Sequence, residues 1–389
     1  MTTAVLESIA LKPADDASPE RKRAYQEALE LPFPNSKDEA WRRTPPEKFH
    51  PGQLTWSEVV TSSSLLGTAA LPEGVLHSDL KSAPVQSELG QLAPCNVFTK
   101  LNEAFWSNGA FVQLGKEQLL NNPLHFEHQV QKGGVAFPRS LIKAGRFSRG
   151  IVVESYSSSD QETLAIPVTE VFLEAGAKLD CVVFHNWGAN TRYLPILRAR
   201  LDKDAHLRVL FVGVGGQMGK NFMEGDLDGE GCKSEMLGLI FGQGRQHLDT
   251  DALHYHNVAH TTSDVLFHVA LTGRARSVFA GNIAVAPGAQ RTDAYQRNRN
   301  LLLSDKARAD AMPKLEISAN DVRCTHGATF ATYDPNQQFY LRSRGLTKTQ
   351  AEHLLVTGFY QEVYGRLEHE ELVGWLNEQM EKVLAQALG

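Results

Sequence analysis

The sequence predicts a mainly β protein in which a β-solenoid core lies between helical segments. Three observations lead to this fold class: short β-rich runs follow one another from about Val97, a turn signature recurs at intervals of roughly 30 residues, and helical periodicity is confined to the two ends of the chain. These observations divide the 389 residues into an N-terminal helical domain (1–95), a β core (96–333) and a C-terminal helical domain (334–389).

The N-terminal domain is expected to begin with a helix at Ser18-Pro19. Serine is favoured at the N-cap and proline in the first turn, and apolar residues follow at helical spacing. A second short helix is expected at 37–42, around Trp41. Residues 51–95 are rich in Ser, Gly and Pro and have little periodicity, so we expect short helices and loops there.

The core region predicts strands alone, because no stretch of ten or more residues holds a period of 3.6. Its β-rich runs are separated by Gly, Asp or Asn, the residues that favour turns. The runs are 111–112, 151–153, 168–172, 181–184, 207–212, 236–241 and 283–285.

A weak internal repeat places a small residue before a basic one. The small residues are separated by 28, 27, 43 and 32 residues, periods that favour stacked coils over a sandwich with strands every 8–12 residues. Small residues at one corner would let successive coils stack closely; chance similarity among Ala-rich turns would give the same pattern, and the sequence leaves both open. The five instances are Ala177-Lys178, Ala205-His206, Cys232-Lys233, Ala275-Arg276 and Ala307-Arg308.

Helical periodicity returns after Tyr333. Thr347 and Gln350 have the spacing of a capping box, and an apolar stripe follows them. A second helix is expected from about Glu368. We expect this two-helix unit to cap the open end of the solenoid and to offer its exposed face for docking. The apolar side of the second helix comprises Leu372, Leu376, Met380, Val383 and Leu384.

Composition excludes several classes of protein. The net charge of −6 and the pI near 6.2 argue against a nucleic-acid binder, which usually has a basic excess. No apolar run reaches the roughly 18 residues of a membrane helix, and the N-terminal stretch lacks the basic start and apolar core of a signal peptide. The four cysteines are far apart, which excludes a disulfide scaffold, a zinc finger and a ferredoxin-type cluster site. A reducing cytoplasm fits best.

The run V-G-V-G-G-Q-M-G-K (212–220) fails as a nucleotide-binding loop. Val214 stands where a Walker A motif needs Gly, Asn221 replaces its Ser or Thr, and Met218 replaces the third Gly of G-x-G-x-x-G. A turn between coils is the favoured interpretation. No known catalytic signature occurs elsewhere, so the sequence does not predict an enzyme.

His254, His256 and His260 form the densest histidine cluster. The first two would share a strand face as a pair of metal ligands. We favour local hydrogen bonding along a polar ridge of the solenoid, while a metal-dependent β-solenoid enzyme using all three histidines remains the alternative. The same caution applies to His185 and His247.

Cys324 and His326 alternate in a strand-like run, which sends both side chains to one face. A thiolate beside an imidazole is a soft metal-binding pair or the start of a nucleophile–base pair. Because a tetrahedral site needs three or four ligands, the pair is either incidental or half of a site that another surface completes. The simpler alternative is a buried cysteine that acts as a small apolar residue.

The run D-V-R-C-T-H-G-A-T (321–329), followed by Q-F-Y-L-R-S-R-G-L (338–346), resembles the signature of the SufB/SufD family, the scaffold subunits of the Suf iron–sulfur cluster assembly complex. The resemblance is strong from about residue 260 and weaker at the N-terminus. The other matching motifs are K-D-E-A-W-R (37–42), H-T-T-S-D (260–264), F-A-G-N-I-A-V (279–285), A-Q-R-T-D-A (289–294), R-N-L-L-L-S (299–304) and P-K-L-E-I (313–317).

The resemblance implies a right-handed parallel β-helix and a non-catalytic role in a SufBCD complex. It implies that a SufB-type scaffold docks at the β-helix end and a SufC-type ATPase at the C-terminal helices. Cys324 and His326 match the family's interface cysteine and histidine, where iron or a nascent cluster would be held transiently with no permanent cofactor. It leaves open whether a flavin supplies electrons in the complex and whether the isolated chain forms a homodimer.

Two positions refine the resemblance. Asn298 stands where the SufB branch has a cysteine, which favours the SufD branch. Thr325 replaces the serine of the usual Cys-Ser-His; its side chain should point away from the face of Cys324 and His326, so little consequence is expected.

Overall fold

The computed structural model describes residues 9–67, 71–83, 88–332 and 335–388. Residues 1–8, part of the stretch without signal-peptide features, and residues 333–334, at the predicted start of the C-terminal domain, lie outside this range. Strands account for 43% of the structure and helices for 20%, so the prediction of a mainly β fold is confirmed. No helix within the described ranges is long and apolar enough to span a membrane.

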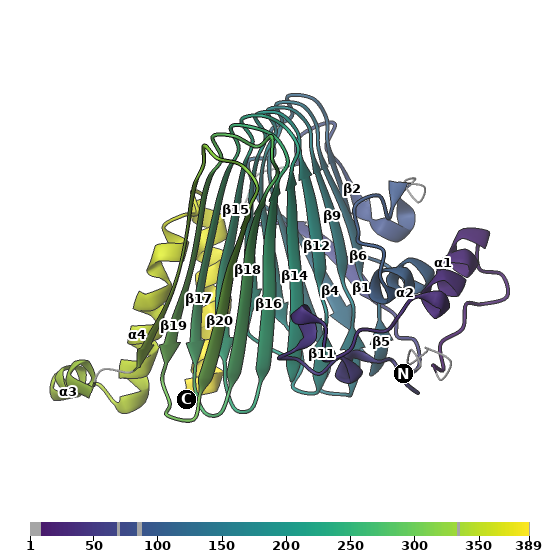
Figure 1. Ribbon diagram of the computed structural model, residues 1–389. Coiled ribbons are helices and arrows are strands. Elements are labelled where there is room, and N and C mark those ends of the chain that lie inside the picture. The colour runs from purple at the N-terminus through teal and green to yellow at the C-terminus, as the bar shows by residue number, and fades with distance from the viewer. Residues whose placement is uncertain (1–8, 68–70, 84–87, 333–334, 389) are drawn as a thin grey trace.

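Two sheets wind into a β-solenoid of about 8 turns (Figure 1). The chain alternates between the sheets, and each strand of the core pairs in parallel with the corresponding strand of the next turn. Sheet B contains β1 Val60–Leu65, β4 Leu124–Val130, β7 Arg149–Ser158, β10 Lys178–Asn186, β13 His206–Gly213, β15 Lys233–Gly242, β17 Thr262–Leu271, β19 Asp293–Leu302 and β21 Arg323–Thr332. Sheet A contains β2 Leu76–Asp79, β3 Ala110–Leu114, β5 Gly134–Ala136, β6 Arg139–Ala144, β8 Thr163–Ala165, β9 Val168–Leu173, β11 Thr191–Tyr193, β12 Ile196–Leu201, β14 Met218–Leu227, β16 His247–His256, β18 Arg276–Val285 and β20 Arg308–Ile317.

A column of prolines interrupts sheet A in the early turns. Pro138, Pro167 and Pro195 separate β5 from β6, β8 from β9 and β11 from β12. Proline has no N–H to donate, so the ladder breaks at each of these positions. In β14 the corresponding place is Asn221, because Phe222 N–H donates to the Pro195 carbonyl. From β14 onward the strands of sheet A run unbroken for 10 residues each.

The turn repeat marks two corners of the solenoid. Ala177, Ala205 and Cys232 precede strands of sheet B, whereas Ala275 and Ala307 precede strands of sheet A. All five are buried, and backbone hydrogen bonds join each corner to the corner of a neighbouring turn. The change of corner explains the one interval of 43 residues, which spans about one and a half turns. The stacked-coil interpretation is therefore confirmed, with two corners in place of one.

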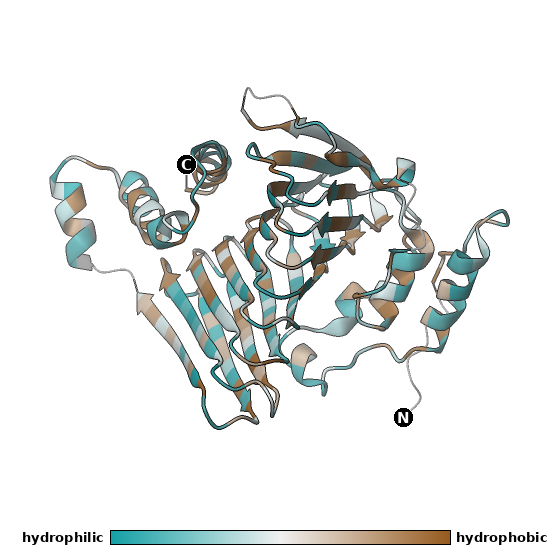
Figure 2. Cartoon of the chain, turned by 90° about the horizontal axis from the view of Figure 1, so that it is seen from above, coloured by the Kyte–Doolittle hydropathy of each residue, from teal (hydrophilic) through white to brown (hydrophobic). Residues whose placement is uncertain are grey.

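Apolar side chains form three layers. The interior of the solenoid is one, the outer face of sheet A with the N-terminal helices is the second, and the outer face of sheet B with the C-terminal helices is the third. Figure 2 shows the two helical groups on opposite sides of the solenoid. The helices are α1 Pro19–Glu30, α2 Val97–Phe105, α3 Pro335–Ser343, α4 Lys348–Tyr364 and α5 Glu370–Leu388, with 3-10 turns η2 Glu39–Trp41, η3 Pro46–Phe49 and η4 Leu80–Ser82.

The N-terminal part differs from its prediction in two places. The Ser18 cap of α1 is present, and η2 covers part of the short helix expected at 37–42. The segment 51–95, expected to hold short helices and loops, also contains β1 and β2, which pair antiparallel with β4 and β3. The region expected to be all-β contains α2, a helix of 9 residues that Asn96 caps and that was too short for its periodicity to be recognised.

The two C-terminal helices form as predicted but do not cap the solenoid. The capping box of Thr347 and Gln350 is present, and the apolar side of α5 is buried. Both helices lie along the outer face of sheet B (Figure 1), because that face presents Val182, Leu210 and Leu237 and must be covered. Tyr360 of α4 donates a hydrogen bond to the Ile240 carbonyl at 2.7 Å.

The last turn of the solenoid is therefore open. β20 pairs with β18 and β21 pairs with β19, and no other strand of the described residues pairs with either of them. Most side chains of β21 are exposed, unlike those of the preceding strands of sheet B.

Candidate functional site

Cys324 and His326 lie on the edge strand β21, at the open end. They pair in register with Ala294 and Gln296 of β19, both of which are buried in the interior. In-register side chains of parallel strands project to the same face. Both Cys324 and His326 therefore face the inner side of the last turn, as the alternation in the sequence indicated.

The Cys324 side chain is half-buried. It packs against a small apolar cluster that includes Ile283, Val285 and Ala294. Burial raises the pKa of the Cys324 thiol, and the nearby Asp293 carboxylate raises it further. The thiol is therefore held in its neutral form at physiological pH, and a cation brought to the site would favour the thiolate.

His326 is exposed, and no third ligand from the described residues joins the pair. Within the described part of the chain, no group of three His, Cys, Asp or Glu side chains is arranged to hold a metal ion. A cysteine and a histidine fit iron or an iron–sulfur cluster by ligand type, but they leave coordination positions open. The arrangement is that of an incomplete site.

The interior directly behind His326 is polar. Gln296, Asn298 and Asn300 of β19 are all buried, and Asn300 Nδ2 donates to Asn298 Oδ1 at 2.6 Å and to the Thr329 carbonyl at 3.1 Å. Within the described ranges, neither amide atom of Gln296 has a hydrogen-bond partner, although both are buried. This buried polar group was not predicted from the sequence. The sequence did contain a signal for it. Polar residues occupy alternate positions of β19, whereas the residues of β17 with which they pair are apolar.

The edge of β21 is available for strand pairing. Arg323 N–H donates to the Thr292 carbonyl at 2.9 Å, which directs the N–H and C=O groups of odd-numbered residues toward β19. The backbone groups of Cys324, His326 and Ala328 therefore point away from the solenoid. An open edge of this kind is a template for a strand from another chain.

The histidine cluster is not brought together as a metal site. His254 and His256 are fully buried inside the solenoid, where His254 Nε2 lies 2.8 Å from Ser234 Oγ, and the two ring nitrogens of His256 lie 2.7 and 2.9 Å from Thr261 Oγ1 and Ser263 Oγ. Burial lowers the pKa of His254 to about 3 and that of His256 to about 4, so both rings are neutral. His260 lies on the surface. Local hydrogen bonding was the favoured interpretation, although these histidines lie inside the solenoid and not on a ridge.

The glycine-rich run 212–220 contains the turn between β13 and β14, which was the favoured interpretation, and its two ends belong to these strands. Lys220 is buried and contacts two carboxylates, Asp249 at 3.0 Å and Asp251 at 2.9 Å. The other two histidines set apart in the sequence also have structural contacts. His185 Nδ1 accepts from Trp187 Nε1, and His247 Nε2 lies 2.7 Å from Thr44 Oγ1.

Comparison with known proteins decides the family. The family model for the SUF system FeS cluster assembly SufBD core domain matches residues 126–359. This chain belongs to the SufBD family. The match begins in β4 and ends in α4, so it includes the parallel core and the Cys324/His326 strand.

Curated SufBD relatives agree along most of the chain. An iron–sulfur cluster assembly SufBD family protein of Mycobacterium leprae is 31% identical over 353 residues, 86% of each chain. A SufBD family protein of Synechocystis is 30% identical over 303 residues, 75% of this chain and 67% of the relative. The iron–sulfur cluster assembly protein SufD of Bacillus subtilis is 27% identical over 325 residues, 82% of this chain and 73% of the relative. The SufBD family resemblance found in the sequence is thus confirmed.

Proposed function

We propose that this chain is a SufD-type, non-catalytic scaffold subunit whose Cys324 and His326 form half of a site for iron or a nascent iron–sulfur cluster. A SufB-type partner completes the site at the open end of the solenoid. The observation that carries the proposal is the position of this pair on the inner face of the last strand, whose outer edge pairs with no other described strand, without a third ligand among the described residues.

The chemistry of the pair suits a transient cargo. The raised pKa of the Cys324 thiol means that the cysteine arrives protonated and releases its proton when a cation binds. Two ligands from this chain hold the cargo weakly, so it can be passed on when the partner moves. Iron or the cluster is thus a substrate of the complex and no resident cofactor is assigned to this chain; a flavin, where one takes part, supplies electrons at the level of the complex.

The two partner surfaces are separate. The SufB-type scaffold pairs with the open edges of β20 and β21, whereas a SufC-type ATPase docks on the exposed side of the C-terminal helices. That side presents Phe339, Tyr340 and Leu354, which are 76%, 56% and 51% exposed.

In the absence of the SufB-type partner, the open edges of β20 and β21 pair two copies of this chain. The reducing cytoplasm is the compartment that keeps Cys324 available.

Co-purification of the chain with its SufB and SufC counterparts, followed by anaerobic cluster reconstitution, tests the proposal. Cys324→Ser and His326→Ala are expected to leave the ternary complex intact and to abolish cluster formation. Thr325→Ala is the matched control, because residue 325 lies on the same strand and faces the opposite way. The cluster content is measured by visible absorption and by the amounts of iron and sulfide per complex.

The alternatives are distinguishable outcomes. A stable complex with unchanged cluster yield in both variants would reduce the chain to a structural partner. No complex, together with stoichiometric metal in the isolated chain that is lost on substitution of His254, His256 and His260, would establish the metal-dependent enzyme.

A further inference from the structure

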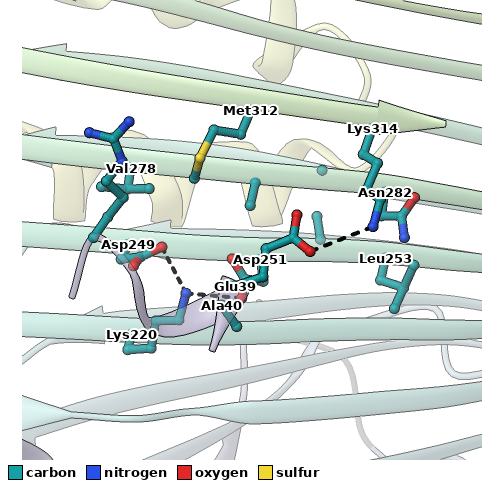
Figure 3. A pocket seen from close by; sticks show the side chains of 14 residues that line it. Glu39, Ala40, Lys220, Asp249, Asp251, Leu253, Val278, Asn282, Met312 and Lys314 are labelled. Atoms are coloured by element: carbon teal, nitrogen blue, oxygen red, sulfur yellow. Dashed lines mark hydrogen bonds and ion pairs between the residues drawn. The ribbon is translucent and has the colours of Figure 1, made fainter. Parts of the chain in front are cut away.

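A cavity of about 210 Å³ lies on the outer face of sheet A, away from the half-site. Its floor is formed by β14, β16, β18 and β20, and its roof by η2, which carries Glu39 and Ala40 (Figure 3). The hollow exists because small residues meet there: Ala280 stands between Asp251 and Met312 in the register of the sheet, beneath Ala40.

One wall of the cavity contains buried charges that satisfy one another. Lys220 contacts both Asp249 and Asp251, and Asp249 also accepts a hydrogen bond from Thr44 Oγ1. Lys220 and Asp249 are each 1% exposed. Lys220 contacts Asp249 Oδ1 as an ion pair, and Thr44 donates to Asp249 Oδ2, whereas only Oδ2 of Asp251 has a contact.

Three buried acceptors on residues that line this space have no hydrogen-bond partner among the described residues. They are Asp249 Oδ1, which has only the ion pair with Lys220, Asp251 Oδ1 and Asn282 Oδ1. The orientation of the Asn282 amide is fixed, because its Nδ2 donates to Glu316 Oε1 at 3.0 Å. Leaving such acceptors unsatisfied is costly, so the site favours a group that donates more than one hydrogen bond.

The surrounding charges select a cation. The basic side chains at the rim are already paired: Arg43 contacts Asp310 at 3.7 Å, and Lys314 contacts Glu316 at 2.7 Å and Glu39 at 3.7 Å. Counted with Lys220, Asp249 and Asp251, these groups comprise three cations and five carboxylates. Burial raises the pKa of Asp251 to about 7 despite the charge of Lys220, and a cation bound beside this carboxyl would lower that pKa again.

The remaining walls are apolar. Leu253, Val278 and Met312 line the space beside Ala280, and a short hydrocarbon chain fits against them. We propose that this cavity binds the guanidinium or ammonium head of a short alkyl cation, with Asp251 Oδ1 and Asn282 Oδ1 as acceptors and the apolar wall around the stem. Two kinds of ligand carry such a head group: a free alkyl cation and a peptide with an arginine side chain.

Titration of the purified full-length chain with n-butylguanidinium, followed by ligand-observed NMR, tests the site. We expect saturable binding that n-butanol does not reproduce. Asp251→Asn should weaken binding by about tenfold or more, because it removes the charge-assisted contact. Asp305→Asn removes the same charge from the turn before β20, outside the cavity and outside the ion pairs counted above, and should leave the affinity within about twofold.

Ala280→Leu provides a second variant, since it fills the cavity without altering charge and should abolish binding. Circular dichroism checks that each variant is folded. Absence of saturable binding to the wild-type chain, or equal binding by the wild-type chain and Asp251→Asn, would overturn the proposal. Acetyl-Gly-Arg-Gly-amide then distinguishes the sources: competition with butylguanidinium assigns the site to a peptide arginine, and binding of butylguanidinium alone assigns it to a free cation.

Discussion

The two ends of the solenoid are built differently. At the first turn, β1 and β2 fold back antiparallel onto β4 and β3, so the chain covers its own sheet edges. At the last turn, β20 and β21 are left without a further strand among the residues described. An uncovered edge invites pairing with another chain. The contrast supports the proposal that a partner strand pairs with the open end, since this protein covers an edge elsewhere.

The two ends also differ in how buried polar side chains are hydrogen-bonded inside the solenoid. In the early turns the buried Glu154 accepts hydrogen bonds from His128 at 3.2 Å, Tyr156 at 3.1 Å and Thr169 at 3.2 Å, and also from Ser140. Burial alone would raise the pKa of Glu154, but the hydrogen bond and charge of His128 keep it below its ordinary value. In the last turns the Gln296 amide has no hydrogen-bond partner among the described residues. The buried carboxylate of Glu154 is thus well satisfied, whereas the buried amide of Gln296 is not.

The largest expected effect is at the closed end. Glu154→Leu removes the acceptor of four buried donors and should lower the free energy of unfolding by about 3–5 kcal/mol. Urea denaturation followed by circular dichroism measures the loss. A change below about 1 kcal/mol would contradict the role assigned to this network.

A proline in the edge strand should weaken partner binding without affecting folding. The Ala328 N–H points to the open edge, so Ala328→Pro keeps the pairing with β19 and removes one hydrogen bond available to a partner strand. Affinity for the SufB-type partner should fall by about tenfold, with little change in thermal stability. Surface plasmon resonance and calorimetry measure the two. Gly327→Pro is the control, since its N–H faces β19 and its loss should destabilise the last turn; equal effects of both variants on stability would refute the assignment of the edge.

Cys324 should be a slower nucleophile than Cys95, which is exposed. A raised pKa lowers the thiolate fraction at every pH below that pKa, so alkylation of Cys324 by iodoacetamide should be about tenfold slower at pH 7.5 and should still increase above pH 9. Peptide mass spectrometry resolves the two sites. Parallel pH profiles for both cysteines would show that the environment of Cys324 does not disfavour the thiolate.

The smallest effect on stability is expected at Gln296. Because its amide has no partner, Gln296→Leu should change the free energy of unfolding by less than about 1 kcal/mol. Cluster yield in the reconstituted complex should nevertheless fall, since Gln296 neighbours His326 in the column of inward-facing side chains. Unchanged yield would restrict Gln296 to packing, and Thr325→Ala again serves as the control.

Local rules allowed much of this fold to be predicted from sequence. The Ser18 cap, the capping box of Thr347 and Gln350, and the shared face of Cys324 and His326 each depend on neighbouring residues. The family resemblance supplied the parallel β-helix, and the turn repeat supplied the stacked corners.

The features that escaped depend on contacts between distant segments. The helix α4 lies on the side of the solenoid because the outer face of sheet B is apolar. That face is formed by residues from several turns. The position of Gln296 next to His326 depends on the register between β19 and β21. The cavity above Ala280 requires four strands and η2, which lies far away in the sequence. No short window of residues contains that information.

The unbroken stacking of the corners has a mechanical consequence. About 8 turns at ~4.8 Å each make a rod of roughly 40 Å whose rungs are fixed by backbone hydrogen bonds. The helix α4 is attached to this rod by Tyr360 and by the contact of Phe359 with His268, close to the open end. Because α4 and the last strands are joined to the same hydrogen-bonded rungs, a displacement of α4 by a bound partner would be passed on to the strand that carries Cys324 and His326.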